Sequence, residues 1–428
     1  MGRVLIIAYH FPPCTGSSGL LRTLKFSHFL PQFGWNPVVL TLQPHAYELV
    51  DERGNESIPT HVPVVRAFAL DTKRHLGYRG VFLRWMALPD RWVTWLLGAV
   101  PTGLRAIRRH KVDVLFSTFP ITTAVLVGLM LHRFSGKPWI VDLRDSMTED
   151  DYPRNARERR VRRWIERQAM RCASRVIFTT PSARRMYLER YPHLPSEKCL
   201  VIPNGYDEDD FASLPVRGTG PVPAGRPLRL LHTGIMYPEE RDPRPFFRAL
   251  ARLKRVGRVD ATNLRICFRA SGFEELYQTY IEELGIADLI ELLPHVPYLQ
   301  SLRDCAECEG LLLFQAASCD HQIPAKAYEY LRLQKPIFAM TTHVGDTGYL
   351  LLETGGATIV HPADEEEIHS VFPDFLAAVR RGTHPLAELQ IVERYARRSQ
   401  AEALAKCLDD LKVCKPVSAR RKVENFES

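Results

Sequence analysis

The sequence contains no long hydrophobic run and no internal repeat. Its apolar stretches stay well below the roughly 18 consecutive apolar residues that a membrane-spanning helix needs. We therefore expect a protein that is soluble or bound peripherally to a membrane. The opening run Met1–Ala8 is short and leads directly into Pro12 and Pro13, which favours a first β-strand over a secretory signal.

Cysteine occurs without the spacing of a disulfide framework. The chain has nine cysteines, an odd number, and this pattern is typical of a reducing cytoplasm with free thiols. Cys305 and Cys308, with Cys319 and His321 further along, could suggest zinc, but a second C-x2-C pair is missing. We expect no bound metal.

Two common nucleotide-binding fingerprints are also absent. The first strand is followed by Gly16, Ser17, Ser18 and Gly19, whose spacing fits neither G-x-G-x-x-G nor G-x-x-x-x-G-K-[ST], so a nicotinamide cofactor and a P-loop NTPase are disfavoured. One interpretation is a plain strand-to-helix turn in which Ser18 caps the helix. The other is an anion site, in which main-chain N–H groups at the helix start meet a phosphate or a sugar.

Positive charge is in excess, with a formal net charge of +8. This predicts an anionic partner such as phosphates, an anionic membrane face or nucleic acid. Residues 154–176 repeat arginine beside apolar residues at helical spacing, and residues 81–100 carry Trp85, Trp92 and Trp95. Both segments suit a membrane surface, and both can equally be a solvated helix face and packed tryptophans. No recognisable nucleic-acid-reading module is present, so we expect no nucleic-acid partner.

The chain of 428 residues is long enough for two domains of roughly 200 residues each. Short runs rich in Val, Ile and Leu alternate with helical stretches, which predicts strands buried on both faces of parallel sheets. The expected strands are Val4–Ala8, Pro37–Leu42, Val64–Phe68, Val114–Thr118, Trp139–Leu143, Val176–Thr179, Leu200–Ile202, Leu228–His232, Leu264–Arg269, Leu289–Leu292, Leu311–Phe314, Pro336–Met340 and Ala357–Val360.

The predicted fold class is α/β, with two Rossmann-like, doubly wound parallel-sheet domains that face a cleft and are closed by a C-terminal helical segment. The first domain is expected over 1–206 and the second over 228–385, joined by a linker at 207–227 that is rich in Gly, Pro and acidic residues. Residues 386–413 are expected to form helices that can return to the first domain. Residues 414–428 are polar enough to be disordered.

Ionisable residues follow the strand Trp139–Leu143, where α/β sheets bind ligands at the carboxyl ends of their strands. Asp142 or Asp145 could accept a proton from an attacking hydroxyl. The alternative is a structural pair of Asp and Arg144 that fixes the loop. His10, near the glycine loop, is more often a structural histidine in such a place.

The second half combines a glycine, two cations and a helical carboxylate. Gly234 ends a strand, Arg241 follows in a loop, and Lys326 and Glu329 lie in a helical stretch; Asn204 begins a tight turn before the linker. Cations for a pyrophosphate and an acceptor for ribose hydroxyls are what a nucleotide diphosphate sugar requires. Each of these residues taken singly can also be a solvated charge or an ordinary turn.

Four short stretches of this sequence, taken in their order along the chain, resemble motifs of the retaining glycosyltransferases of the GT-B fold, sequence family four. Members of this group often show FPP…GG after the first strand, a central IPNGVD, a G…R/K loop and a P-x-K-x-x-E stretch. The counterparts here are Phe11–Pro13 with Gly16 to Gly19, Ile202–Asp207, Gly234 with Arg241, and Pro324–Lys326 with Glu329. The resemblance covers about residues 1–410.

This resemblance implies that Glu329 holds the ribose of a donor nucleotide, that Arg241 and Lys326 neutralise its diphosphate, and that the glycine loop approaches the donor phosphate or sugar. The chain departs from the family at one position. Where the family usually has a glutamate that contacts the transferred sugar, this sequence has His321, next to Asp320. Either side chain could take that role.

The expected activity is therefore transfer of a hexose-type sugar from a nucleotide diphosphate-sugar to a saccharide acceptor, with retention of configuration. We expect the acceptor to be lipid-linked and the pathway to be cell-surface polysaccharide or glycan biosynthesis at the cytoplasmic membrane face. Cations and helix ends can stabilise the leaving diphosphate, so we expect no cofactor and no metal, and the nucleotide-sugar is the substrate. Two alternatives stay open: a nucleotide-sugar epimerase of the same fold, and a non-catalytic basic protein that binds nucleic acid.

Overall fold

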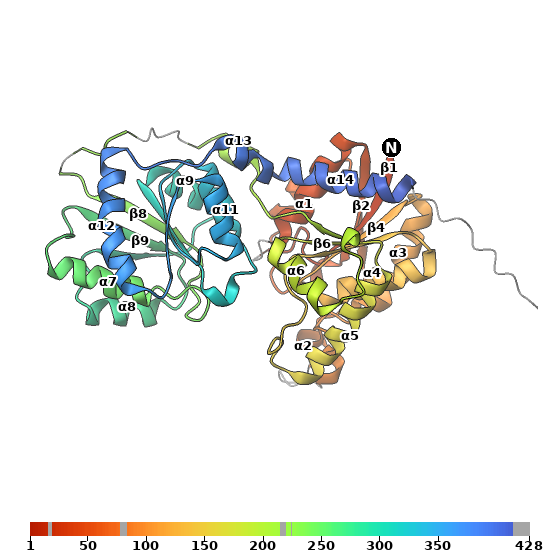
Figure 1. Ribbon diagram of the computed structural model, residues 1–428. Coiled ribbons are helices and arrows are strands. Elements are labelled where there is room, and N and C mark those ends of the chain that lie inside the picture. Colours follow the sequence, from red (N-terminus) through yellow and green to blue (C-terminus); the bar gives the residue numbers. More distant parts are fainter. Residues whose placement is uncertain (16–18, 78–83, 215–219, 224, 414–428) are drawn as a thin grey trace, which may run out of the picture. The chain divides into compact units, whose positions relative to one another are not determined.

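The computed structural model describes residues 1–15, 19–77, 84–214, 220–223 and 225–413. Gly16, Ser17 and Ser18 of the glycine loop, residues 215–219 and 224 of the expected linker, and the tail 414–428 lie outside these residues. The chain divides into two compact units (Figure 1). The first comprises residues 1–177, 193–200 and 401–413, and the second comprises 178–192 and 201–400.

The first sheet has seven strands in the order β3-β2-β1-β4-β5-β6-β7. The strand pairs from β3 to β5 are parallel. All four apolar residues of β1 from Val4 to Ile7 are fully buried, because helices cover both faces of such a sheet. The strands are β1 (Gly2–Ile7), β2 (Trp35–Leu42), β3 (Val64–Ala67), β4 (Val114–Thr118), β5 (Trp139–Leu143), β6 (Arg175–Phe178) and β7 (Cys199–Val201).

The chain order reverses between β1 and β4, where a doubly wound sheet usually places its ligand site. The helices that follow these strands are α1 (Gly19–Phe29), α2 (Thr72–His75), α3 (Trp95–Arg109), α4 (Thr122–Ser135), α5 (Ala156–Cys172) and α6 (Pro181–Arg190). The last helix, α14 (Arg397–Val413), lies mostly in the first unit, where Asp409 accepts a hydrogen bond from the Trp35 indole at 2.8 Å.

The second sheet has six strands in the order β10-β9-β8-β11-β12-β13, and every neighbouring pair is parallel. Its strands are β8 (Leu228–Thr233), β9 (Leu264–Arg269), β10 (Ile290–Leu293), β11 (Gly310–Phe314), β12 (Ile337–Met340) and β13 (Ala357–Val360). Its helices are α7 (Arg244–Arg255), α8 (Glu274–Glu283), α9 (Tyr298–Glu307), α10 (Ala325–Arg332), α11 (Asp346–Thr354), α12 (Glu365–Arg381) and α13 (Leu389–Val392).

Side chains of β11 alternate between two hydrophobic cores. Leu312 and Phe314 join the core under α7, α8 and α12, whereas Leu311 and Leu313 join the core under α9, α10 and α11. The two groups of helices therefore cover opposite faces of the sheet (Figure 1). This arrangement explains the continuous apolar runs in the sequence, because both faces of each strand are buried.

The predicted α/β fold with two parallel sheets is confirmed. Every expected strand is present, displaced by at most two residues at either end. The expected helical region at 386–413 consists of α13, a short 3-10 turn at Glu393–Tyr395 and α14. Within the described residues no helix is both long and apolar enough to cross a membrane. The eight cysteines in the described part of the chain are free thiols.

Candidate functional site

Gly234 follows directly after β8, at the carboxyl edge of the second sheet. Its φ of +95° is a conformation that residues with a side chain rarely adopt. A Cβ atom at this position would lie 2.7 Å from the Nζ atom of Lys326. The glycine is therefore required both by the turn and by the close approach of the lysine.

Lys326 lies in the first turn of α10 and reaches back to the end of β8. Its ammonium donates a hydrogen bond to the backbone carbonyl of Thr233 and lies 3.5 Å from Nε2 of His232. Burial, together with the positive charge of Arg241, lowers the pKa of Lys326 to about 7, while the charge of Glu329 acts in the opposite direction. An anion bound beside Lys326 would stabilise the charged ammonium and raise the pKa of Lys326 again.

Glu329 is three residues further along α10, so it lies on the same helix face as Lys326. Its Oε1 atom accepts a hydrogen bond of 3.0 Å from the hydroxyl of Tyr298, the first residue of α9. Burial raises the pKa of Glu329 to about 7, against the opposing effects of this hydrogen bond and of the Lys326 charge. A carboxylate held in this way can accept hydrogen bonds from vicinal hydroxyl groups.

Arg241 comes from the loop between β8 and α7. Its Nη1 donates to the carbonyl of Ile235 at 3.1 Å, and the guanidinium lies 5.7 Å from the ring centroid of Tyr237. Its charge helps to lower the pKa of both Lys326 and His232, so the guanidinium is electrostatically coupled to them. The structure thus brings together Gly234, Arg241, Lys326 and Glu329, as expected from the sequence pattern.

Two residues of this cluster were missed by sequence reasoning. Tyr298 gave no signal, because a tyrosine at the start of a helix is common. His232 did give one, since it interrupts the apolar strand run LLHT. Its side chain is fully buried, and its Nδ1 lies 2.9 Å from the carbonyl oxygen of Leu312.

His321 lies in the loop between β11 and α10 and is half-buried. Its Nε2 is 3.3 Å from Nε2 of Gln322, and its backbone carbonyl accepts from the Thr180 hydroxyl at 2.7 Å. The neighbouring Asp320 accepts a hydrogen bond of 2.5 Å from the hydroxyl of Thr342. Both side chains are half-buried and in contact with neighbouring residues.

Asn204 is half-buried and precedes a glycine that is packed against the backbone. A Cβ atom on Gly205 would lie 1.7 Å from the carbonyl oxygen of Tyr395. The next residue, Tyr206, forms an isolated parallel bridge with Ala396. The Asn-Gly pair thus marks the place where the segment before α14 packs closely against the chain that follows β7.

In the first unit, Asp142 is a fully buried structural partner. Its carboxylate accepts hydrogen bonds from Nε and Nη2 of Arg22, at 3.1 and 2.8 Å, and from the hydroxyl of Thr118 at 2.9 Å. Arg22 and Asp142 are 2% and 0% exposed. Asp142 is thus held in a buried ion pair as the structural alternative expected, but its partner is Arg22 on α1 and not Arg144.

Arg144 is also buried, and burial lowers its pKa. It donates to the carbonyl of Phe119 at 2.6 Å and to that of Gly19 at 2.7 Å. A Cβ atom on Gly19 would lie 2.7 Å from the guanidinium, which explains the glycine at the start of α1. Asp145 is exposed, so it is the more accessible of the two predicted carboxylates. His10 is held neutral, because burial lowers its pKa to about 3.

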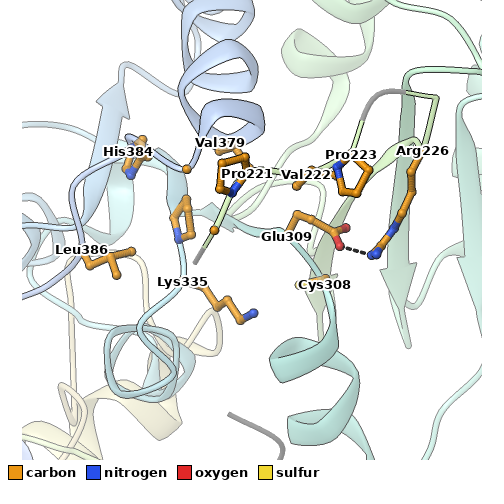
Figure 2. A pocket seen from close by; sticks show the side chains of 13 residues that line it. Pro221, Val222, Pro223, Arg226, Cys308, Glu309, Lys335, Val379, His384 and Leu386 are labelled. Carbon is orange, nitrogen blue, oxygen red and sulfur yellow. Dashed lines mark hydrogen bonds and ion pairs between the residues drawn. The ribbon is translucent and has the colours of Figure 1, made fainter. Parts of the chain in front are cut away.

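A separate cavity of about 190 Å³ lies at the opposite edge of the second sheet (Figure 2). Its lining includes Arg226, Glu309 and Pro336, which precede β8, β11 and β12, whereas the cluster around Lys326 lies where the strands end. Arg226 and Glu309 form an ion pair at its rim. Across the described residues no three His, Cys, Asp or Glu side chains are grouped as metal ligands.

Comparisons with known proteins concern the family and the fold. Residues 22–205 match the sequence model of the glycosyl transferase 4-like domain. No curated protein matches the chain. Among similar solved structures, a sucrose-phosphate synthase from Thermosynechococcus elongatus has 13% sequence identity and a TM-score of 0.65, and the match covers 97% of this chain and 100% of the other. HepE of Anabaena in complex with UDP and glucose has 14% identity and a TM-score of 0.62, with 96% of this chain and 100% of the other covered. A UDP-GlcNAc 2-epimerase from Methanocaldococcus jannaschii has 13% identity and a TM-score of 0.55, with 96% of this chain and 100% of the other covered.

The match over residues 22–205 and the fold of the whole chain agree with the resemblance noted in the sequence. Sequence identities of this size establish a shared fold. The fold shared with these structures is GT-B. Activity and substrate have to be argued from the site.

Proposed function

Since residues 22–205 match a glycosyl transferase 4-like domain and the whole chain has the GT-B fold, we propose that the protein transfers a sugar from a nucleotide diphosphate-sugar to a hydroxyl of a saccharide acceptor. The observation that supports this most strongly is the cluster at the carboxyl edge of the second sheet. There the cations Arg241 and Lys326 lie beside the carboxylate of Glu329.

The proposed roles follow from charge and geometry. Lys326 and Arg241 bind the diphosphate and stabilise the negative charge that grows on it as the sugar leaves. Glu329, oriented by Tyr298, accepts hydrogen bonds from the ribose hydroxyls. His321 contacts the transferred sugar. Burial and the nearby charge of Arg241 lower the pKa of Lys326 in the absence of donor, and a bound diphosphate would favour the charged form of the lysine.

The finer features of the reaction rest on the family resemblance. We propose transfer of a hexose-type sugar with retention, in which the leaving phosphate helps to deprotonate the acceptor hydroxyl and the protein mainly positions the two substrates. We propose that Asp145, an exposed carboxylate, positions the acceptor. We propose that Asn204 and the loop around Gly19 contact the donor. Side-chain cations take the role that a divalent metal has in other transferases, so no metal or cofactor is part of the proposal.

We further propose that the acceptor is lipid-linked and that the protein works at the cytoplasmic face of a membrane, in the assembly of a cell-surface glycan. One stripe of α5 supports this. The exposed residues Arg157, Arg160, Trp164, Arg167 and Arg171 recur at helical spacing, and Trp164 is 48% exposed. Arginines around an interfacial tryptophan suit anionic lipid headgroups. We call these five residues the arginine face.

The membrane proposal is tested by sedimentation with vesicles of phosphatidylglycerol and phosphatidylcholine. Removing two charges with Arg160→Gln and Arg167→Gln should weaken binding about tenfold or more, since each cation near an anionic surface contributes about 1 kcal/mol. The matched control is Arg255→Gln with Arg258→Gln, which changes the exposed last residue of α7 and an exposed residue just beyond it. Equal loss in both double variants would refute a specific role of the arginine face. Tight binding to an oligonucleotide with a steep salt dependence would favour the nucleic-acid alternative.

The donor site is tested by thermal shift with UDP, GDP and ADP, because a ligand that binds only the folded protein raises its melting temperature. Glu329→Ala and Arg241→Ala should each abolish the shift caused by the best nucleotide. If both variants respond like the parent protein, the donor site is wrongly assigned. Turnover of a nucleotide-sugar to its epimer in the absence of acceptor would instead support the epimerase alternative.

A further inference from the structure

His232 is the one ionisable side chain of β8 that lies fully buried beside the proposed donor site. The rings of Phe314 and Phe268 lie 5.1 and 6.2 Å from its own, so aromatic side chains pack against it. A leucine or phenylalanine would fill such a place without the cost of burying a polar ring. The histidine therefore calls for an explanation beyond packing.

Hydrogen-bond chemistry fixes the tautomer of this imidazole. The carbonyl oxygen of Leu312 can only accept, so the Nδ1 atom that lies 2.9 Å from it must carry the proton. In the neutral ring, Nε2 then has a lone pair and can only accept. It faces Nζ of Lys326 at 3.5 Å, so the ammonium is the donor.

This inference rests on the proposed function. We propose that His232 is a positioning residue: its neutral imidazole holds the ammonium of Lys326 at the end of β8, where it meets the diphosphate of the donor. The carbonyl of Thr233 accepts a second N–H of the same ammonium. An ammonium has three N–H groups, so one is left to donate to the diphosphate.

The charged groups around Lys326 agree with this role. Arg241 repels the ammonium, Glu329 attracts it, and the buried thiol of Cys305 adds a weaker interaction. Burial and the charges of Lys326 and Arg241 lower the pKa of His232 well below its usual value, against the opposing hydrogen bonds with the backbone of Leu312 and Gly234. His232 therefore stays neutral over the physiological range and keeps its lone pair for the lysine.

The test is the affinity for UDP and for inorganic diphosphate, measured calorimetrically between pH 6.5 and 8.5. His232→Leu removes the acceptor, so we expect about tenfold weaker binding of both ligands at pH 7.5. Loss of the acceptor also lowers the pKa of Lys326 further, so the affinity should begin to fall at a lower pH than in the parent. His232→Gln, whose side-chain carbonyl can accept from Lys326, should recover most of the affinity.

Two controls separate positioning from folding. His384→Leu removes another buried histidine of the second unit, one bonded to Thr358 and to the carbonyl of Pro385 at the far edge of the sheet, and should leave both affinities unchanged. His232→Phe is a second apolar replacement that suits the neighbouring phenylalanines, in case His232→Leu folds poorly. With Lys326→Met as background, His232→Leu should cause no further loss.

The outcomes distinguish the inference from the function on which it rests. A parent protein that binds neither ligand would refute the donor site and the inference together. A parent protein that binds, with His232→Leu and His232→Phe equal to it in affinity and pH dependence, would overturn the role of His232 alone. A loss that persists undiminished in the Lys326→Met background would also overturn it, because His232 would then act through another group.

Discussion

The ion pair between Arg22 and Asp142 allows a quantitative test of a structural role. Asp142→Asn keeps the shape of the side chain but removes its charge and replaces one acceptor oxygen by an NH2 group, which cannot accept from Arg22. The guanidinium is only 2% exposed, so it would remain buried without a counter-charge. Breaking a buried ion pair by changing one partner costs about 3–5 kcal/mol.

This cost should be visible as a fall in melting temperature. For a unit of about 200 residues, 1 kcal/mol corresponds to about 2–4 °C, so Asp142→Asn should melt roughly 10 °C lower in the transition of the first unit. Differential scanning calorimetry measures the shift. Arg22→Met combined with Asp142→Leu, which replaces the pair by apolar side chains, should recover much of the stability.

Asp150→Asn is the matched control, because Asp150 is an exposed aspartate in the loop that follows β5, the strand of Asp142. Its melting temperature should stay within about 1–2 °C of the parent, as for most surface changes. If Asp142→Asn melts like the parent but loses transferase activity, Asp142 is a catalytic base and the structural assignment is refuted. If Asp145→Asn loses activity without loss of stability, the proposed acceptor role of Asp145 is supported.

Three further predictions follow from the site and from close backbone packing. Affinity for UDP should be highest near pH 7. Above it Lys326, whose pKa is lowered to about 7, loses the charge that attracts the diphosphate, and below it Glu329, whose pKa is raised to about 7, loses the charge of the ribose-binding carboxylate; calorimetry that shows a flat profile from pH 6 to 9 would contradict this. Tyr298→Phe removes the hydrogen bond to Glu329 and should weaken UDP about fivefold while leaving inorganic diphosphate unchanged. Gly205→Ala should lower the melting temperature strongly, because its Cβ would lie 1.7 Å from a carbonyl oxygen, whereas Gly220→Ala, with open space around it, should have little effect in the same melting assay.

Much of the fold could be predicted because its signals are local. Each strand is a short run of Val, Ile and Leu, and burial on both faces of a parallel sheet makes such runs continuous. The spacing of Lys326 and Glu329 is also local, since residues three apart share one face of a helix. The sequence likewise placed Gly234 at the end of a strand, where a positive φ was needed.

The roles of individual polar residues depended on partners far along the chain. Asp142 and Arg22 are 120 residues apart, and Lys326 and His232 are 94 apart. Such pairs meet only when parallel strands are paired in a particular register, and register is set by the whole sheet. The sequence could therefore offer Asp142 as a catalytic base or as a structural ion pair, but not choose between them.

The amino-acid sequence by itself determined the two parallel sheets, the succession of strands and helices, and the kinds of residue available at the end of β8 and along α10, because these depend on patterns within a few turns of chain. Only the tertiary structure decided that Asp142 forms the buried ion pair and that His232 faces Lys326. Those outcomes depend on desolvation and on hydrogen-bond geometry between distant segments, and neither exists until the sheets have formed.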